Sequence, residues 1–128
     1  MKRPSPMTYV LEFHQTYGAA VRDVPVAVPP EADLRIDLLK EELGEYIDAV
    51  NAGDVVEVAD ALADVVYVAY GAALTHGIDL DAVLAEVHLS NMSKVGEDGN
   101  PVLREDGKVM KGPNYFEPDV AGVLGLEL

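Results

Sequence analysis

Apolar residues recur at helical spacing through most of the first 94 residues of the chain. Side chains three or four residues apart share one face of a helix. A first helix is predicted over about 8–20, with apolar positions at Tyr9, Val10, Phe13 and Tyr17. The same periodicity predicts three more helices, over about 32–50, 54–76 and 79–94. Three prolines within 24–30 predict an extended connector before the second helix.

The pattern changes after residue 96, where turn-forming residues surround two short apolar runs. Asp106-Gly107 lies between Val102–Arg104 and Val109–Lys111, an arrangement typical of a small β-hairpin. Short connections between long helices favour antiparallel neighbours. We therefore expect an all-α fold in a single domain, 1–128. It would be an antiparallel four-helix bundle (about 8–94) with a short C-terminal hairpin and tail (96–128). The apolar end of the tail would pack on the bundle or on another subunit.

Acidic side chains occupy positions in the second predicted helix where apolar ones are expected. On a helical wheel of residues 32–50, most apolar residues share one broad arc. Glu42 and Glu45 fall inside this arc, and Arg35 falls near Glu42. Glu41 lies beside the arc, on the solvated face. The second helix therefore presents an acidic pair toward its neighbours.

The third predicted helix is apolar around most of its circumference, which is typical of a central, buried helix. Glu57, Asp60 and Asp64 nevertheless share one stripe of it, and residues 54–76 contain no Lys or Arg. Burying several unpaired carboxylates costs several kcal/mol or more unless cations neutralise them. Two adjacent helices with inward acids would form an all-oxygen site suited to Mg²⁺, with Mn²⁺ as a second candidate. The alternative is that these acids face solvent or pair with Arg35 and with lysines elsewhere.

Polar and basic residues end the fourth predicted helix. Asn91 and Lys94 continue its inner apolar stripe by steps of four and three residues. Four of the nine bases lie within 94–111, namely Lys94, Arg104, Lys108 and Lys111. In a chain of net charge −14 they form a local positive patch that would hold phosphates, with Tyr115 as a candidate for stacking on a base. The alternative is that these are ordinary surface lysines around turns.

The composition excludes several function classes. The net charge of −14 argues against binding to a nucleic acid polymer. The absence of cysteine excludes disulfides, thiolate metal sites and cysteine nucleophiles. The longest nearly apolar run, 65–74, is too short to cross a bilayer. The three histidines lack a common metal-binding spacing, and no P-loop pattern is present. We expect a cytoplasmic protein that acts on a small molecule, without membrane association.

The acidic motifs resemble those of a known family. Glu42-Leu43-Gly44-Glu45 is an E-x-x-E pattern, and Ala63-Asp64-Val65-Val66-Tyr67 follows in the third helix. In these motifs the chain resembles the MazG-like all-α nucleoside triphosphate pyrophosphohydrolases. These are related to dimeric dUTPases and to phosphoribosyl-ATP pyrophosphohydrolase. The resemblance covers most of the chain and includes Glu12–His14, Leu34–Arg35, Leu39–Leu43, Gly77–Asp79, Ser90–Lys94, Asp106–Lys108 and Lys111–Pro113.

The resemblance implies hydrolysis of an NTP or dNTP to the monophosphate and pyrophosphate, as a nucleotide-pool housecleaning reaction. It implies Mg²⁺ ions held by Glu42, Glu45, Asp64 and either Asp60 or Glu57. Glu41 would be the candidate base that orients the attacking water. The groups that position the phosphates would be Asn91, Lys94, Arg35, Lys108 and Lys111. Members of the family form homodimers or homotetramers, so a second copy of the chain is the expected protein partner.

One motif departs from the family pattern. The second acidic motif of the family is usually E-x-x-D, and a motif that ends at Asp64 places Ala61 at the glutamate position. Glu57-Val58-Ala59-Asp60 is a literal E-x-x-D one turn earlier, so either frame could supply ligands. The departure supports an alternative hypothesis of a non-catalytic helical oligomer. Such a protein would bind metal or nucleotide and act as a regulatory or partner module.

Overall fold

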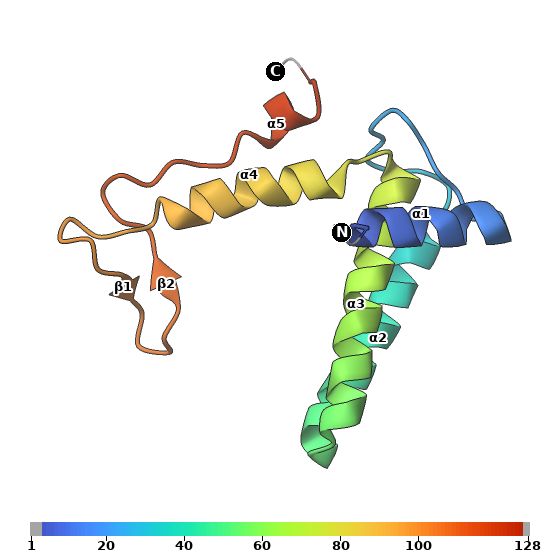
Figure 1. The fold of residues 1–128 in the computed structure, drawn as a ribbon, viewed down its shortest axis with the longest axis horizontal. Coiled ribbons are helices and arrows are strands. Elements are labelled where there is room, and N and C mark those ends of the chain that lie inside the picture. The colour runs from blue at the N-terminus through green and yellow to red at the C-terminus, as the bar shows by residue number, and fades with distance from the viewer. Residues whose placement is uncertain (1–3, 127–128) are drawn as a thin grey trace. The chain divides into compact units, whose positions relative to one another are not determined.

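The computed structural model describes residues 4–126, and it is mostly helical (Figure 1). In chain order its elements are α1 (Pro6–Tyr17), α2 (Ala32–Ala52), α3 (Val55–His76), α4 (Leu80–Met92), β1 (Val102–Leu103), β2 (Val109–Met110) and α5 (Val120–Val123). The chain divides into a first compact unit that ends at Leu80 and a second that begins at Asp81. The four predicted helices and the hairpin are all present, so the all-α fold class is confirmed. The last two residues of the predicted tail, Glu127 and Leu128, lie outside the described residues.

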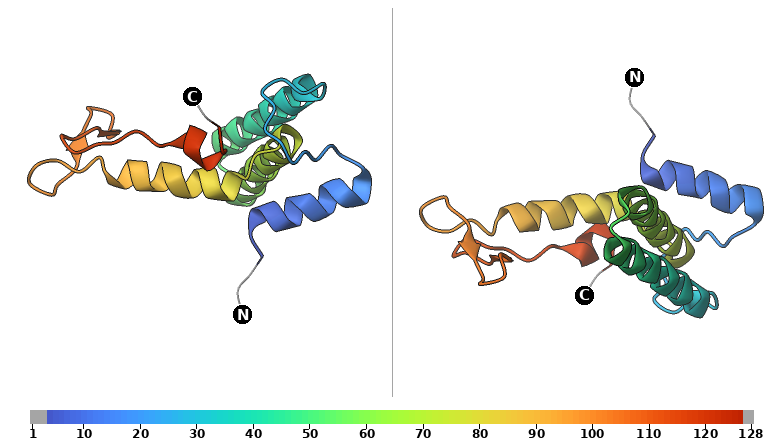
Figure 2. Two further views of the ribbon diagram at one scale, coloured as in Figure 1. Left: turned by 90° about the horizontal axis from the view of Figure 1, so that it is seen from above. Right: turned by 90° about the horizontal axis from the view of Figure 1, so that it is seen from below.

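In the first unit, α2 and α3 form an antiparallel pair that lies side by side in all views (Figure 2). The turn between them is short because Gly53 adopts a left-handed conformation (φ 68°) that ends α2. Asp54 then caps α3, and its carboxylate accepts hydrogen bonds from the backbone N–H groups of Val56 and Glu57 at 3.1 and 3.2 Å. This two-residue turn determines which residues of α2 and α3 face one another.

The core of the first unit lies where α1 crosses the C-terminal half of α3. Val10, Tyr70 and Leu74 are buried there, with Met7, Leu11 and Leu80 packed around them. The predicted extended connector is present after α1 and is tied to the end of α3. The backbone N–H of Arg22 donates to the Leu74 carbonyl (3.0 Å), and that of Val26 donates to the His76 carbonyl (2.8 Å). These bonds hold the connector against the helix end.

The prediction that α3 is a central, buried helix holds for only part of its length in the single chain. Its last turns, from Tyr70 to Thr75, are mostly buried, but Val55 and Val56 at its start are 77% and 72% exposed. Within this unit α1 and α2 pack on α3, and the buried residues that α1 and α3 share, Val10, Tyr70 and Leu74, lie toward the end of α3. The helical wheel reports that a face is apolar, but it does not report whether a neighbouring segment covers that face.

In the second unit, β1 and β2 pair antiparallel, with Val102 opposite Met110 and Leu103 opposite Val109. The hairpin prediction is therefore confirmed, although each strand has only two residues. The chain then runs back along α4 and is fastened to it by side chains. Ser90 Oγ donates to the Phe116 carbonyl (2.8 Å), and Ser93 Oγ accepts from the Phe116 N–H (3.1 Å). Glu86 accepts from the Asp119 N–H at 3.0 Å.

Helix boundaries differ from the prediction by at most three residues. The first helix ends at Tyr17 and not near residue 20, because Gly18 adopts a left-handed conformation. The fourth ends at Met92, so that Lys94 lies in the turn after the helix. In the described part of the chain, residues 4–126, no helix combines the length and apolar character that a membrane span requires.

Candidate active site

Three carboxylates meet where the middle of α2 faces the middle of α3. Glu42 and Glu45 are three residues apart on α2 and therefore share one face of the helix. The antiparallel register brings Asp64 of α3 opposite them. One carboxylate oxygen from each residue lies within 4.8 Å of the other two. We refer to Glu42, Glu45 and Asp64 as the carboxylate cluster.

The electrostatics of the cluster disfavour three free negative charges. The pKa of Glu42 is raised, first by desolvation, then by a hydrogen bond to Glu45 and by the charges of Glu45, Asp64 and Glu41. Desolvation also raises the pKa of Asp64, with further contributions from Asp60 and Glu45. Glu42 and Asp64 therefore hold a proton more tightly than an isolated carboxyl does. Occupation of the site by a cation would remove this repulsion.

The donor set of the cluster fits a hard divalent cation. Glu42 Oε2 is buried, and no group among residues 4–126 forms a hydrogen bond with it. The ion pairs found in this part of the chain, Arg22–Glu31 and Arg104–Asp106, involve none of the three acids. Carboxylate oxygens without a basic partner are the ligands that Mg²⁺ prefers. Of the five acids predicted as ligands, the structure brings these three together.

The other two predicted ligands, Glu57 and Asp60, lie nearby but outside the cluster. They line a cavity of about 300 Å³ between the end of α2 and the start of α3, which Glu45 also borders. Asp48 and Asp54 complete its acidic wall. Asp48 was not among the predicted site residues, although its i+3 spacing from Glu45 places both residues on one face of the helix. Ala61, which occupies the glutamate position of the second motif, is buried and borders the same cavity.

Arg35 lies apart from the carboxylate cluster and has internal partners. It is seven residues before Glu42, about 10 Å along the helix axis. The side chain is only 9% exposed, and its Nη2 donates to the Val68 carbonyl at 3.0 Å. The imidazole of His14 lies nearby, and the charge of Arg35 helps to lower the pKa of that histidine, after the larger effect of burial. In this structure Arg35 joins α2 to α3.

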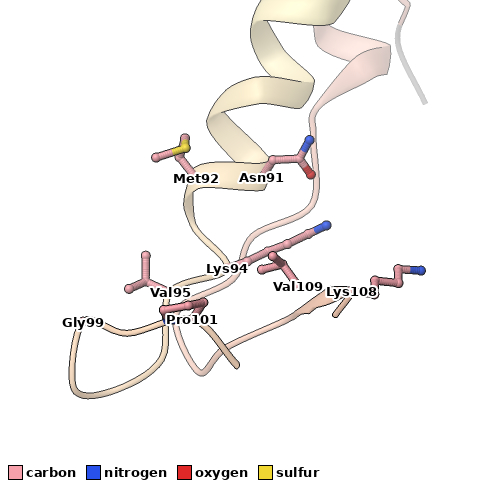
Figure 3. Close-up of a pocket in the computed structure, with 8 residues that line it drawn as sticks. All are labelled: Asn91, Met92, Lys94, Val95, Gly99, Pro101, Lys108 and Val109. Atoms are coloured by element: carbon pink, nitrogen blue, oxygen red, sulfur yellow. The ribbon is translucent and has the colours of Figure 1, made fainter. Parts of the chain in front are cut away.

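The second unit contains a pocket of about 530 Å³ between the end of α4 and the hairpin (Figure 3). Three of the predicted substrate-binding residues, Asn91, Lys94 and Lys108, line it. The other two in this unit do not. Lys111 instead places its Nζ 4.7 Å from the centroid of the Tyr115 ring, in a cation–π contact. Glu41, the predicted base, is exposed on α2 beside the carboxylate cluster.

Comparisons with known proteins identify a matching family, a related sequence and a similar fold. Residues 10–91 match the family model described as phosphoribosyl-ATP pyrophosphohydrolase. An uncharacterised protein of Acanthamoeba polyphaga mimivirus, L479, is 34% identical over 105 residues. That match covers 78% of this chain and 39% of the viral protein, so the chain spans well under half of that relative. The matched family range includes Glu42, Glu45 and Asp64 and ends before Lys94.

A solved structure has a similar fold. It is the crystal structure of a candidate NTP pyrophosphohydrolase from Exiguobacterium sp. 255-15. The two structures have a TM-score of 0.50 and 23% sequence identity, and the alignment covers 97% of this chain and 96% of the other. At this identity the likeness concerns the fold, and it extends over both units of the chain.

Proposed function

The chain belongs to the phosphoribosyl-ATP pyrophosphohydrolase family, and from this membership we propose that it hydrolyses a nucleoside triphosphate, NTP or dNTP, to the monophosphate and pyrophosphate. The observation that carries the proposal is the carboxylate cluster, which has the donor set of a Mg²⁺ site and lies within the matched range. The description of the Exiguobacterium protein as an NTP pyrophosphohydrolase favours a triphosphate substrate. We further propose a role in clearing unwanted nucleotides from the cellular pool.

Glu42, Glu45 and Asp64 would hold Mg²⁺, and Mn²⁺ would satisfy the same oxygen ligands. When bound, such an ion supplies charge neutralisation at phosphate oxygens and lowers the pKa of a water. Asp60 and Glu57, on the wall of the neighbouring cavity, are the candidates for further ligands. Either residue would supply the ligand that the family motif has as a glutamate at the position of Ala61.

The remaining steps belong to side chains that handle the water and the phosphates. Glu41 is exposed and lies next to Glu42, so it can accept a proton from a water near the cluster without itself being a ligand. Asn91, Lys94 and Lys108 offer donors that can bind phosphate oxygens. No covalent nucleophile is required. We assign Arg35 a structural role, because its buried guanidinium already donates to the Val68 carbonyl.

Pyrophosphate release tests the proposal directly. The substrates are the NTPs, the dNTPs and phosphoribosyl-ATP, each with Mg²⁺, with Mn²⁺ and with EDTA. We expect metal-dependent release of pyrophosphate with an equal amount of monophosphate. Substitution of Glu42 by Gln should lower kcat/KM by about 100-fold or more, since changes at residues that only support metal ligands already cost 10–100-fold. Asp37→Asn, on an exposed position of the same helix, is the matched control.

The alternative of a non-catalytic binding module rests on Ala61. It predicts that metal or nucleotide binds while no substrate in the panel releases pyrophosphate under any metal condition. Turnover that persists unchanged in Glu42→Gln would refute the assignment of the cluster as the metal site, whichever function holds.

A further inference from the structure

The pocket of the second unit combines an apolar wall with a cationic wall. Its apolar lining comes from Met92, Val95, Pro101 and Val109. Figure 3 shows Met92, Val95 and Pro101 toward one side and the polar ends of Asn91, Lys94 and Lys108 toward the other. The volume of about 530 Å³ lies within the roughly 300–1,000 Å³ typical of small-molecule sites. An amphipathic anion with a flat apolar part would match both walls.

The two lysines of the pocket are free to bind an anion. Within residues 4–126, neither Lys94 nor Lys108 forms an ion pair with a carboxylate. Arg104, in the same hairpin, is neutralised by two hydrogen bonds to Asp106. Two unpaired ammonium groups therefore remain at one pocket of a chain whose net charge is −14. Ammonium groups are common ligands of phosphate.

Several apolar side chains that line the pocket are exposed, so a bound ligand would remove apolar surface from water. Met92 is 62% exposed, and Val95 and Val109 are 41% and 44% exposed. Covering these side chains with an aromatic ring removes apolar area from water, which is favourable at roughly 25 cal/mol per Å². The thioether of Met92 also makes favourable contacts with aromatic rings.

The hydrogen bonds that hold the backbone around the pocket do not involve the side chains that line it. Ser90 is 2% exposed, and Ser90 and Ser93 use their hydroxyls to fasten the returning chain. Asn91 and Lys94, the next residue after each serine, remain for the pocket. The Gly96 N–H donates to the Asn100 carbonyl at 2.8 Å, which closes the loop on the other side. These bonds hold the backbone on both sides of the pocket.

We infer that this pocket binds the nucleoside monophosphate part of a nucleotide, with the base against Met92, Val95 and Val109 and the phosphate at Lys94 and Lys108. The inference rests on the proposed function, which makes a nucleotide the relevant ligand. It goes further because it locates recognition of the base at Met92, Val95 and Val109, which lie outside the family range of residues 10–91. All the groups that it uses belong to the second unit, so binding does not require a divalent cation.

Calorimetric titration of the full chain with nucleoside monophosphates, in EDTA at moderate salt, tests this inference. We expect saturable binding of at least one monophosphate and weaker binding of inorganic phosphate, which has no base. Lys94→Gln and Lys108→Gln should each raise Kd by about 10-fold or more, the worth of a charge-assisted hydrogen bond. Met92→Ala should raise it about 5-fold through lost apolar contact. Lys40→Gln removes the same charge from an exposed position on α2 and should change Kd by less than about 2-fold.

The outcomes separate this inference from the proposed function. An enzyme that hydrolyses triphosphates with Mg²⁺ but binds no monophosphate in EDTA would overturn the pocket and leave the proposed function intact. Equal losses in Lys40→Gln and Lys94→Gln would overturn it as well, because binding would then be general electrostatic attraction. Unchanged affinity in Met92→Ala would refute the placement of the base. Monophosphate binding without hydrolysis of any triphosphate would support the pocket and overturn the proposed activity. Glu42→Gln should bind the monophosphate as the parent chain does.

Discussion

Replacing Gly71 by alanine tests whether Arg35 is a structural residue. Gly71 is buried in α3, where a methyl group would overlap Arg35 Nη2. The same methyl group would lie 2.9 Å from His14 Nε2 and 3.1 Å from Arg35 Cζ. Real carbon atoms keep larger separations, so the guanidinium must move. It can do so only by giving up its 3.0 Å hydrogen bond to the Val68 carbonyl.

Two opposing terms determine the size of the effect. A hydrogen bond from a charged group contributes about 1.5–3 kcal/mol to stability. An alanine within a helix is more favourable than a glycine by about 1 kcal/mol. Gly71→Ala should therefore lower the free energy of unfolding by about 0.5–2 kcal/mol. Gly44→Ala is the matched control, because Gly44 is also inside a helix but no atom lies within 4 Å of the added methyl group. That variant should gain about 0.5–1 kcal/mol.

Urea denaturation followed by far-UV circular dichroism, at one protein concentration, measures both variants. In an Arg35→Ala background most of the cost of Gly71→Ala should disappear, because the nearest side chain that it displaces is absent. If Gly71→Ala stabilised the protein as Gly44→Ala does, the close packing of Arg35 on α3 would be refuted. If Arg35→Ala left stability unchanged and raised only KM, Arg35 would be a substrate-binding residue and not a structural one.

Three further predictions concern the acids. Without metal near pH 8, Glu42→Gln should raise Tm, because it removes one of the repelling charges of the cluster. With saturating Mg²⁺ it should lower Tm relative to the parent chain, because a ligand is lost, and thermal melts with Mg²⁺ or EDTA measure both signs. The pKa values of Glu42 and Asp64 are raised in the folded chain. At a pH between their unfolded-state and folded-state pKa values, the folded state therefore binds more protons than the unfolded state. The contribution of these groups to stability should fall as pH rises above about 4–4.5. Thermal melts in EDTA across this pH range should show a smaller decrease in Tm for Asp64→Asn than for the parent chain. An equal decrease in Tm would contradict the raised pKa of Asp64. Asp54→Ala should cost about 1 kcal/mol in urea unfolding, because it removes the cap of α3, whereas Asp54→Asn should cost little.

The sequence determined the parts of the site that lie within one helix. Glu42 and Glu45 share a face because three residues make almost one turn, and this follows from helix geometry alone. Asn91 and Lys94 were placed together for the same reason, and the structure keeps both at one pocket even though the helix ends at Met92. The Asp106-Gly107 turn predicted the hairpin because few residues other than glycine accept its backbone conformation. Each of these inferences depends on neighbours along the chain.

Tertiary structure decided which acids of α3 meet those of α2. Glu57, Asp60 and Asp64 share one stripe, and the wheel ranks none of them above the others. The Gly53-Asp54 turn and the packing of α3 set a register in which Asp64 lies opposite Glu42 and Glu45. Glu57 and Asp60 then fall on the wall of the next cavity.

The partners of Arg35 and Lys108 were likewise decided by contacts between segments that are distant in the sequence. Nothing near Arg35 in the sequence indicates that its partner is the carbonyl of Val68, 33 residues later. Only the hairpin brings Lys108 to the pocket that Lys94 lines, whereas Lys111 is drawn to Tyr115. Periodicity and turn preference are local properties of the chain, so the sequence alone expresses them. The partners of each face depend on contacts between distant segments, and those form only when the chain packs.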